Sequence, residues 1–137
     1  MAANSPFTLR DQQRLDGLHP TLKNELAAIF TEMYSLGYRL FVVQGVRTAA
    51  EQAKLYAQGR TSPGKIVTNK DGVKFRSNHQ PHADGFGHAV DVAFLGTHSP
   101  FDEAWPWELL GTKAEQRNLR WGGRWTHPHD APHIEMA

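Results

Sequence analysis

The sequence predicts a small α+β protein in which helices pack against an antiparallel sheet. Its 137 residues are 39% apolar and 21% charged, ordinary values for one globular domain with a buried core. Two helical patterns come first, and strand and helix patterns then follow in mixed order. No internal repeat, low-complexity tract or linker interrupts the chain, so we expect residues 1–137 to form one domain with no separate binding module.

The first two predicted helices have clear start signals. Ser5-Pro6 fits an N-cap followed by a first helical position. Pro20 begins a second helix, and Gly37 closes it as a C-terminal glycine does. One apolar stripe at helical spacing predicts the buried face of this second helix: Leu22, Leu26, Ile29, Phe30 and Met33.

A strand and a capped helix are predicted next. Residues 38–43 read YRLFVV and are rich in β-forming side chains. Thr48 and Glu51 fit the two ends of a capping box, which predicts a helix that runs to about Gln58. Arg47 therefore lies at a strand-to-helix junction, where side chains often face a cleft.

The second half of the chain contains shorter elements between polar loops. We first expect a small hairpin, in which Ile66-Val67 and Val73-Lys74-Phe75 flank a turn at 69–72. A strand over 88–95 and a helix from Pro106 to about Asn118 follow. The chain is expected to end with a turn at Trp121-Gly122-Gly123 and a short strand over 134–136. The central window before the second strand is expected to be a loop, because it contains Pro81, Gly85 and Gly87.

Composition excludes several classes of function. A net charge of +1, without a block of Lys or Arg, predicts no nucleic-acid partner. Cysteine is absent, so any metal held by side chains depends on histidine and carboxylate. The first fifteen residues lack the features of a secretory signal, and no apolar run is long enough to span a membrane. We therefore expect the chain to stay in the cytoplasm unless something releases it.

Histidines and carboxylates gather in two windows, 76–94 and 125–135, and seven of the eight histidines lie from His79 to His133. Zinc takes imidazole and carboxylate ligands, and a catalytic zinc site uses three of them and keeps one position open. His79, Asp91 and His133 can supply the three. Residue types alone leave this choice open, because His82 or His88 can replace His79 and an isolated histidine is more often not a ligand.

Two carboxylates flank the last histidine of this set. Asp130 can take a proton from an attacking water as general base, or it can simply be a turn residue before Pro132. Glu135 shares a strand face with His133 and can orient its imidazole, but an exposed carboxylate is the simpler interpretation.

Arg47 and two tryptophans are further candidates. Arg47 can clamp a substrate carboxylate or stabilise an oxyanion, although an exposed arginine paired with Glu51 is the simpler interpretation. Trp121 and Trp125 are expected near the site because they lie close to Asp130 in the sequence.

Four motifs, in a fixed order, resemble those of the LAS zinc peptidases, a family that includes D-alanyl-D-alanine carboxypeptidases and phage L-alanyl-D-glutamate endopeptidases. They are Gly45-Val46-Arg47, Ser77-Asn78-His79 with Gly87-His88-Ala89-Val90-Asp91, Trp121-Gly122-Gly123-Arg124-Trp125, and Asp130-Ala131-Pro132-His133. The resemblance runs from about Pro20 to the C-terminus. The residues Gln80 to Phe86 separate His79 from Gly87, where the shorter family pattern has two residues, so we interpret 81–85 as an inserted loop.

The resemblance implies a zinc ion held by His79, Asp91 and His133, with Asp130 as catalytic base and Arg47 as the contact to substrate or transition state. His82 is the alternative first ligand because of the insertion. The implied fold has the zinc site in a cleft.

The resemblance further implies an endolysin, a single catalytic domain that cuts the peptidoglycan stem peptide between L-Ala and D-Glu. Such an enzyme would wait in the host cytoplasm as a monomer, reach the periplasmic wall at lysis, and have fifteen Lys and Arg residues available for contact with outer-membrane lipid. A D-Ala-D-Ala carboxypeptidase is the first alternative, and a non-catalytic wall-binding module is the second.

Overall fold

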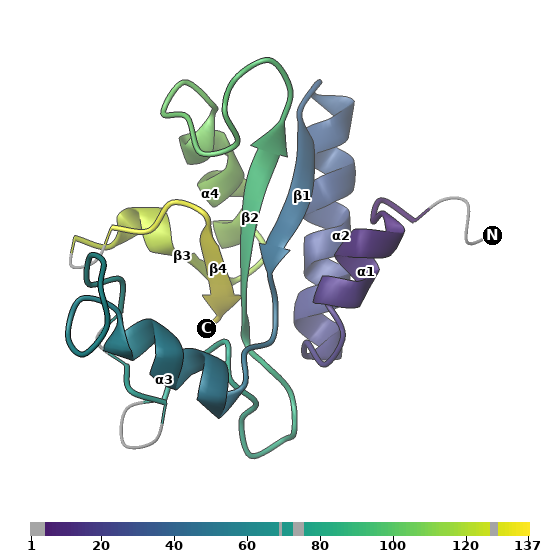
Figure 1. Cartoon of the computed structure of the whole chain (residues 1–137). Helices are drawn as coiled ribbons and strands as arrows, with labels where there is room; N and C mark the ends of the chain where they lie inside the picture. The colour runs from purple at the N-terminus through teal and green to yellow at the C-terminus, as the bar shows by residue number, and fades with distance from the viewer. Residues whose placement is uncertain (1–4, 69, 73–75, 127–128) are drawn as a thin grey trace.

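A four-stranded antiparallel sheet with the order β1-β2-β4-β3 organises the protein (Figure 1). The computed structural model describes residues 5–68, 70–72, 76–126 and 129–137. The strands are β1 (Arg39–Gln44), β2 (Ala89–Leu95), β3 (Leu119–Trp121) and β4 (His133–Met136). The α+β class expected from the sequence is confirmed.

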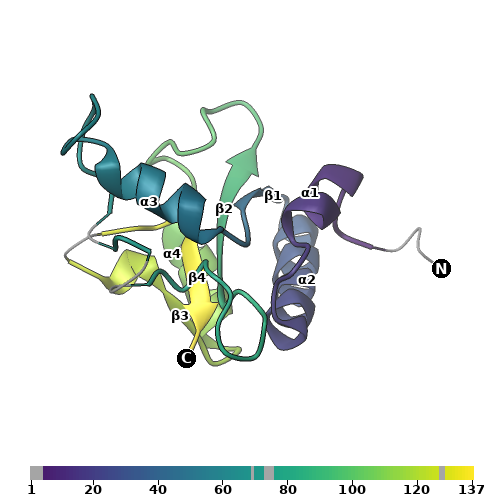
Figure 2. The same ribbon diagram turned by 60° about the horizontal axis from the view of Figure 1, so that its bottom comes forward.

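The helices divide into a layer against the sheet and one helix apart from it. Helices α2 (Pro20–Ser35) and α4 (Trp107–Glu115) contact each other and the two outer strands, and α1 (Leu9–Arg14) lies beside β1. Helix α3 (Ala49–Ala57) lies at one end of the sheet, on the side away from α2 and α4 (Figure 2). The longest helix has 16 residues, and within the described part of the chain none combines the length and apolarity needed to cross a membrane.

Side chains along β2 alternate between the hydrophobic core and the face of the sheet that carries the candidate site. Val90, Val92 and Phe94 are fully buried in the hydrophobic core with the stripe of α2, all of whose five predicted members are at most 3% exposed. Because successive strand side chains point to opposite faces, Asp91 faces the other side of the sheet, toward α3. The core therefore fixes the strand that carries one of the predicted metal ligands.

Helix α1 covers the open edge of the sheet through two side chains. The buried Asp11 carboxylate accepts a hydrogen bond from the Val42 N–H at 2.9 Å, and Arg14 Nη1 donates to the Val42 carbonyl oxygen at 2.7 Å. These bonds satisfy edge groups of β1 that no strand pairs with. The helix start expected at Ser5-Pro6 was wrong. Helix α1 begins after Thr8, where Thr8 and Asp11 form a capping box.

A further expectation on regular structure, the small hairpin, was wrong in the half that the structure describes. Ile66 and Val67 are exposed and belong to no strand, and residues 73–75, the other half of the expected hairpin, lie outside the described residues. Side chains satisfy the backbone of this segment, since Gln58 Nε2 donates to the Lys65 carbonyl oxygen and Gln52 Nε2 donates to that of Lys70.

The predicted turn at 121–123 is a strand end followed by a short helix. Trp121 is the last residue of β3, which pattern reading missed because it has only 3 residues, and a 3₁₀-helix spans Gly122–Arg124. Helix α4 ends at Glu115, before the expected Asn118, whose φ of 61° is incompatible with a continuing helix. The expected capping box of Thr48 and Glu51 is confirmed.

Candidate metal centre

Strand pairing brings the three predicted ligands together. Asp91 of β2 lies opposite His133 of β4, and His79 comes from the loop before β2. Asp91 Oδ1 lies 3.4 Å from His79 Nε2 and 3.1 Å from His133 Nδ1, and one ligand atom from each residue lies within 4.8 Å of the other two. Two imidazole nitrogens and one carboxylate oxygen fit a zinc ion with an open coordination position.

Each histidine has its second ring nitrogen occupied elsewhere. His79 Nδ1 lies 2.8 Å from the Gly45 carbonyl oxygen, and His133 Nε2 lies 2.7 Å from Glu135 Oε1. An N–H at these two nitrogens donates to the oxygens, which leaves His79 Nε2 and His133 Nδ1 as lone-pair donors facing Asp91. Different nitrogens of the two rings are therefore presented to a metal.

Glu135 was expected to be exposed, and this was wrong. It is 4% exposed, and its second carboxylate oxygen accepts a hydrogen bond from Asn78 Nδ2 at 2.9 Å. The cause is the strand period, because Glu135 lies on the same face of β4 as His133. The spacing of two residues was the signal in the sequence, but only strand pairing reveals that this face is covered.

Charge is strongly coupled within the cluster. Burial alone would lower the pKa of His133, but its hydrogen bonds with Asp91 and Glu135 raise the pKa from 6.5 to about 9. Burial would raise the pKa of Asp91, yet hydrogen bonds from His133 and His79 hold it well below the ordinary value. Without metal, a proton on His133 thus neutralises part of the negative charge.

Arg47 is buried just before the N-terminus of α3. It is 8% exposed, with Nη1 donating to Gln52 Oε1 at 2.6 Å and Nη2 donating to Gln44 Oε1 at 2.7 Å. The simpler expectation of a surface arginine paired with Glu51 is wrong, because Arg47 is buried and both of its terminal nitrogens donate to glutamines, while Glu51 accepts from the backbone N–H of Thr48. Burial lowers the pKa of Arg47, whereas the Asp91 carboxylate opposes this effect.

The Arg47 segment and the first histidine support each other. The Arg47 backbone N–H donates to the His79 carbonyl oxygen at 2.8 Å. The Nε atom of Arg47 is buried and has no hydrogen-bond partner among the described residues, so one donor of this side chain is left unsatisfied. Sequence reasoning missed Gln52, which is fully buried and links Arg47 to the backbone of Lys70.

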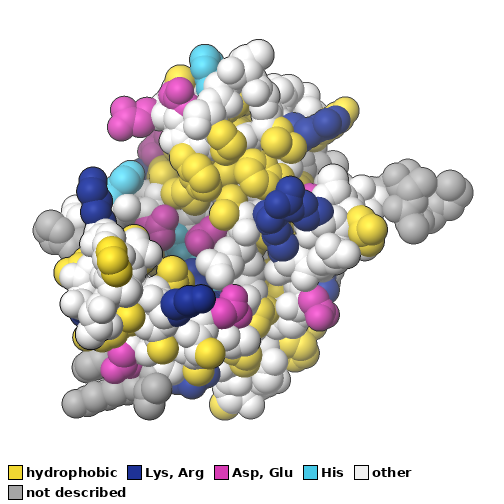
Figure 3. Space-filling view, in the orientation of Figure 1, with side chains coloured by type: hydrophobic (Ala, Val, Ile, Leu, Met, Phe, Trp, Pro, Cys, Tyr) yellow, Lys and Arg dark blue, Asp and Glu magenta, His cyan; other side chains and the backbone are white. Residues whose placement is uncertain are grey.

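A cleft of about 480 Å³ joins these groups, and its walls include His79, Asp91 and His133 together with Arg47 and Asp130. Figure 3 shows acidic and histidine side chains recessed in a hollow between α3 and the sheet, with basic side chains beside them. All five residues predicted to act in catalysis or metal binding therefore face one space.

Asp130 lies at the edge of the cluster, with Oδ2 3.9 Å from His133 Nδ1. Burial raises its pKa, and the nearby Asp91 carboxylate adds to this increase. The backbone of Gly122 packs closely against that of Asp130. The Asp130 N–H donates to the Gly122 carbonyl oxygen, and a Cβ on Gly122 would lie 2.3 Å from the Asp130 carbonyl oxygen. Only glycine permits this approach.

One of the two tryptophans is a cleft residue. Trp125 lines the cleft, and its ring centroid lies 4.9 Å from that of His133. Trp121 is instead 4% exposed in the core, where its Nε1 donates to the Ala131 carbonyl oxygen at 2.7 Å. The expectation for Trp121 therefore holds only indirectly, through the segment between Asp130 and His133.

The alternative histidines lie outside the cluster. The rings of His82 and His88 are stacked with centroids 3.7 Å apart, and His88 Nε2 lies 2.7 Å from Asp84 Oδ2. Neither belongs to the metal-compatible group found among the described residues. This geometry favours His79 over His82 as the first ligand.

Comparison with known proteins agrees with this geometry. Residues 71–136 match the model of a peptidase M15 family described as D-alanyl-D-alanine carboxypeptidase. The peptidoglycan L-alanyl-D-glutamate endopeptidase CwlK of Bacillus subtilis is 29% identical over 145 aligned residues, which cover 97% of this chain and 81% of the relative.

Solved structures extend the match to the fold. The Serratia marcescens L-Ala D-Glu endopeptidase ChiX is similar with a TM-score of 0.64 and 25% identity, over 96% of this chain and 89% of that one. A mutant of the vancomycin resistance D,D-pentapeptidase VanY in complex with Zn(II) shares the fold with a TM-score of 0.61 and 17% identity, over 87% and 72% of the two chains. The chain is thus a homologue of the L-alanyl-D-glutamate endopeptidases, and its sequence and fold matches support a LAS-type zinc peptidase similar to the M15 family.

Proposed function

We propose that this peptidase hydrolyses the bond between L-Ala and D-Glu in the peptidoglycan stem peptide, and that it does so as a phage endolysin. The observation that carries the proposal is the single cleft in which His79, Asp91 and His133 meet a buried arginine and a carboxylate of raised pKa. The similarity to two L-Ala–D-Glu endopeptidases supports the choice of bond.

In this proposal His79, Asp91 and His133 hold the zinc ion through Nε2, a carboxylate oxygen and Nδ1. When bound, zinc supplies Lewis acidity, which polarises the scissile carbonyl and makes a water molecule more acidic. Gly45 and Glu135 fix the orientations of the two imidazoles through their hydrogen bonds.

Asp130 acts as the general base. It takes a proton from the attacking water and then passes it to the leaving nitrogen of the scissile amide. Burial and the Asp91 carboxylate raise its pKa, which moves the carboxyl group toward the operating pH, where a general base is most effective.

Arg47 stabilises negative charge on the substrate. Gln44 and Gln52 hold its two terminal nitrogens, so that the guanidinium does not need to reorganise during the reaction. The unpartnered Nε is a donor that a substrate oxygen can accept from. A non-catalytic wall-binding module would have no need for either Asp130 or this arginine.

A D-Ala-D-Ala carboxypeptidase is the second candidate, because the matching family model has this description. Mass spectrometry of Gram-negative peptidoglycan after digestion, with and without a chelator, separates the candidates. Chelator-sensitive fragments with a new D-Glu amino terminus support the endopeptidase, and released D-Ala supports the carboxypeptidase. An unchanged wall would contradict both and favour the binding module.

The endolysin role includes a site of action. We infer that the monomeric enzyme accumulates in the host cytoplasm and reaches the periplasmic wall after a membrane lesion, with its basic residues contacting outer-membrane lipid. Expression in a Gram-negative host, with and without a pore-forming protein, tests this role. Lysis only in the presence of the pore is the expected result, and lysis by the enzyme alone would contradict cytoplasmic retention.

A further inference from the structure

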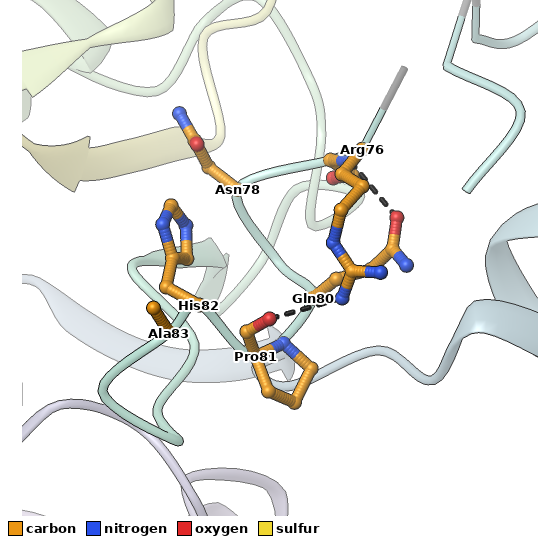
Figure 4. A pocket seen from close by; sticks show the side chains of 7 residues that line it. Arg76, Asn78, Gln80, Pro81, His82 and Ala83 are labelled. Carbon is orange, nitrogen blue, oxygen red and sulfur yellow. Dashed lines mark hydrogen bonds between the residues drawn. The ribbon is translucent and has the colours of Figure 1, made fainter. Parts of the chain in front are cut away.

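A second hollow adjoins the catalytic cleft. It has a volume of about 420 Å³, and we call it the side pocket (Figure 4). Its lining consists of Arg76, Ser77, Asn78, Gln80, Pro81, His82 and Ala83. Because Arg76, Ser77 and Asn78 also line the catalytic cleft, a ligand bound at the metal centre can extend directly into the side pocket.

The wall of the side pocket is held by hydrogen bonds. Gln80 is fully buried, donates through Nε2 to the Gly72 carbonyl oxygen at 3.0 Å, and accepts from the Ser77 N–H at 2.9 Å. The His88 N–H donates to the Asn78 carbonyl oxygen at 2.8 Å, which ties the start of the inserted loop to its end. The hollow is thus a shaped part of the fold.

Arg76 supplies the pocket with a cation. Figure 4 shows its guanidinium group at the hollow, with one hydrogen bond from Nη2 to the Pro81 carbonyl oxygen at 3.0 Å. Within the described ranges no carboxylate lies within ion-pair distance of Arg76. A guanidinium has five N–H donors, so most of them stay available to a ligand.

The charge of the surrounding segment favours an anion. Residues 45–78 carry seven Lys or Arg and two Asp or Glu residues, whereas the rest of the chain carries eight and twelve. Lys70, from this segment, also lines the catalytic cleft. Arg47, Lys70 and Arg76 thus place three basic side chains in the lining of this cleft, where they attract a negatively charged ligand.

We propose that the side pocket is a subsite for a free carboxylate of the stem peptide on the carboxyl side of the cleaved bond, and that Arg76 is its specificity-determining residue. This rests on the proposed cleavage between L-Ala and D-Glu. Glutamate uses one carboxyl group to continue the chain and keeps the other free, whereas the carboxyl group of L-Ala is consumed in the scissile bond. The carboxyl side is thus the side that presents an anion to a guanidinium.

Binding of a product analogue tests the subsite without turnover. The probes are γ-D-glutamyl-L-lysine and its diamide, in which both carboxylates are amides, titrated by calorimetry into the zinc-loaded full chain. We expect the wild type to bind the acid at least roughly tenfold more tightly than the diamide. Arg76→Gln should remove this preference by weakening only the acid, and Arg76→Lys should restore part of it.

The matched control is Arg10→Gln, which removes an exposed charge from α1 and should leave the preference unchanged. Equal binding of the two probes by the wild type, no binding of either, or an Arg76→Gln protein that keeps the preference would overturn the subsite. Zinc content and melting temperature show whether Arg76→Gln is folded, and the comparison of probes on the wild type does not depend on any variant. An unchanged wall with a retained preference for the acid would contradict the proposed cleavage and leave the subsite in place.

Discussion

The Glu135 carboxylate accepts a hydrogen bond from Nε2 of His133 at 2.7 Å, and both side chains lie on one face of β4. This bond leaves Nδ1 of His133 as the atom that faces Asp91. The other Glu135 oxygen accepts from Asn78, next to His79, so one buried carboxylate links both histidine segments. Its position suits a residue that orients a metal ligand without touching the metal.

We therefore expect Glu135→Gln to weaken zinc binding by about 10- to 100-fold, the range typical of such partners. A glutamine can face either His133 or Asn78 with its oxygen, but it presents an N–H donor to the other. Competition with a fluorescent chelator measures the effect, and Glu103→Gln, at an exposed site, is the control. Unchanged zinc affinity would show that the Glu135 bond does not orient His133.

His79 and His82 form a matched pair for testing the ligand set. His79→Ala should abolish stoichiometric zinc binding, because it removes one of three converging ligands. His82→Ala should keep the zinc, because its ring is stacked on His88. Metal analysis of both purified proteins is the measurement, and the reverse outcome would make His82 the ligand of the inserted loop.

The raised pKa of His133 predicts how zinc binding depends on pH. The folded state holds the His133 proton more tightly than the unfolded chain, so in the metal-free protein this stabilisation is fully present below pH 6.5 and is lost as pH rises through about 9. Zinc requires unprotonated Nδ1, so binding at neutral pH should release one proton and strengthen roughly tenfold per pH unit up to that value. Titration calorimetry at pH 7 in buffers of different ionisation enthalpy counts the proton. Binding without proton release would contradict a protonated His133.

Asp130→Asn should separate catalysis from metal binding. Loss of the base is expected to lower kcat by about 10²- to 10⁴-fold, while zinc content and melting temperature stay close to the wild type. Hydrolysis of peptidoglycan by Asp130→Asn at the wild-type rate would remove the residue from its role.

Local sequence signals predicted those parts of the fold that depend on neighbouring residues. The stripe of α2 and the capping box of Thr48 and Glu51 are complete within one helix, and both are confirmed. The strand expected at Ile66-Val67 was wrong because Gln52 of α3 and Gln58 at its C-terminal end satisfy nearby carbonyl groups, a contact that no local pattern encodes.

The site residues were predicted from the sequence, but the residues that support them were not. Residue types and motif order identified His79, Asp91 and His133, and strand pairing accounts for their meeting. The burial of Glu135 and Arg47 was missed, because it depends on segments that the fold brings together from far apart in the chain. Partners of site residues are thus harder to predict than the site residues themselves.

Arg47→Lys tests whether the geometry of the guanidinium matters as well as its charge. Lysine keeps the positive charge, but a single ammonium cannot bond Gln44 and Gln52 and also present a donor where Arg47 Nε lies. We expect kcat/KM to fall roughly 100-fold, the scale of losing one transition-state donor, with zinc content unchanged. Arg39→Lys, at the exposed start of β1, is the control because Arg39 lies outside the cleft lining. Wild-type kcat/KM in Arg47→Lys would mean that charge alone is required, and loss of zinc would mean that Arg47 acts through the backbone of His79, to which its own N–H donates.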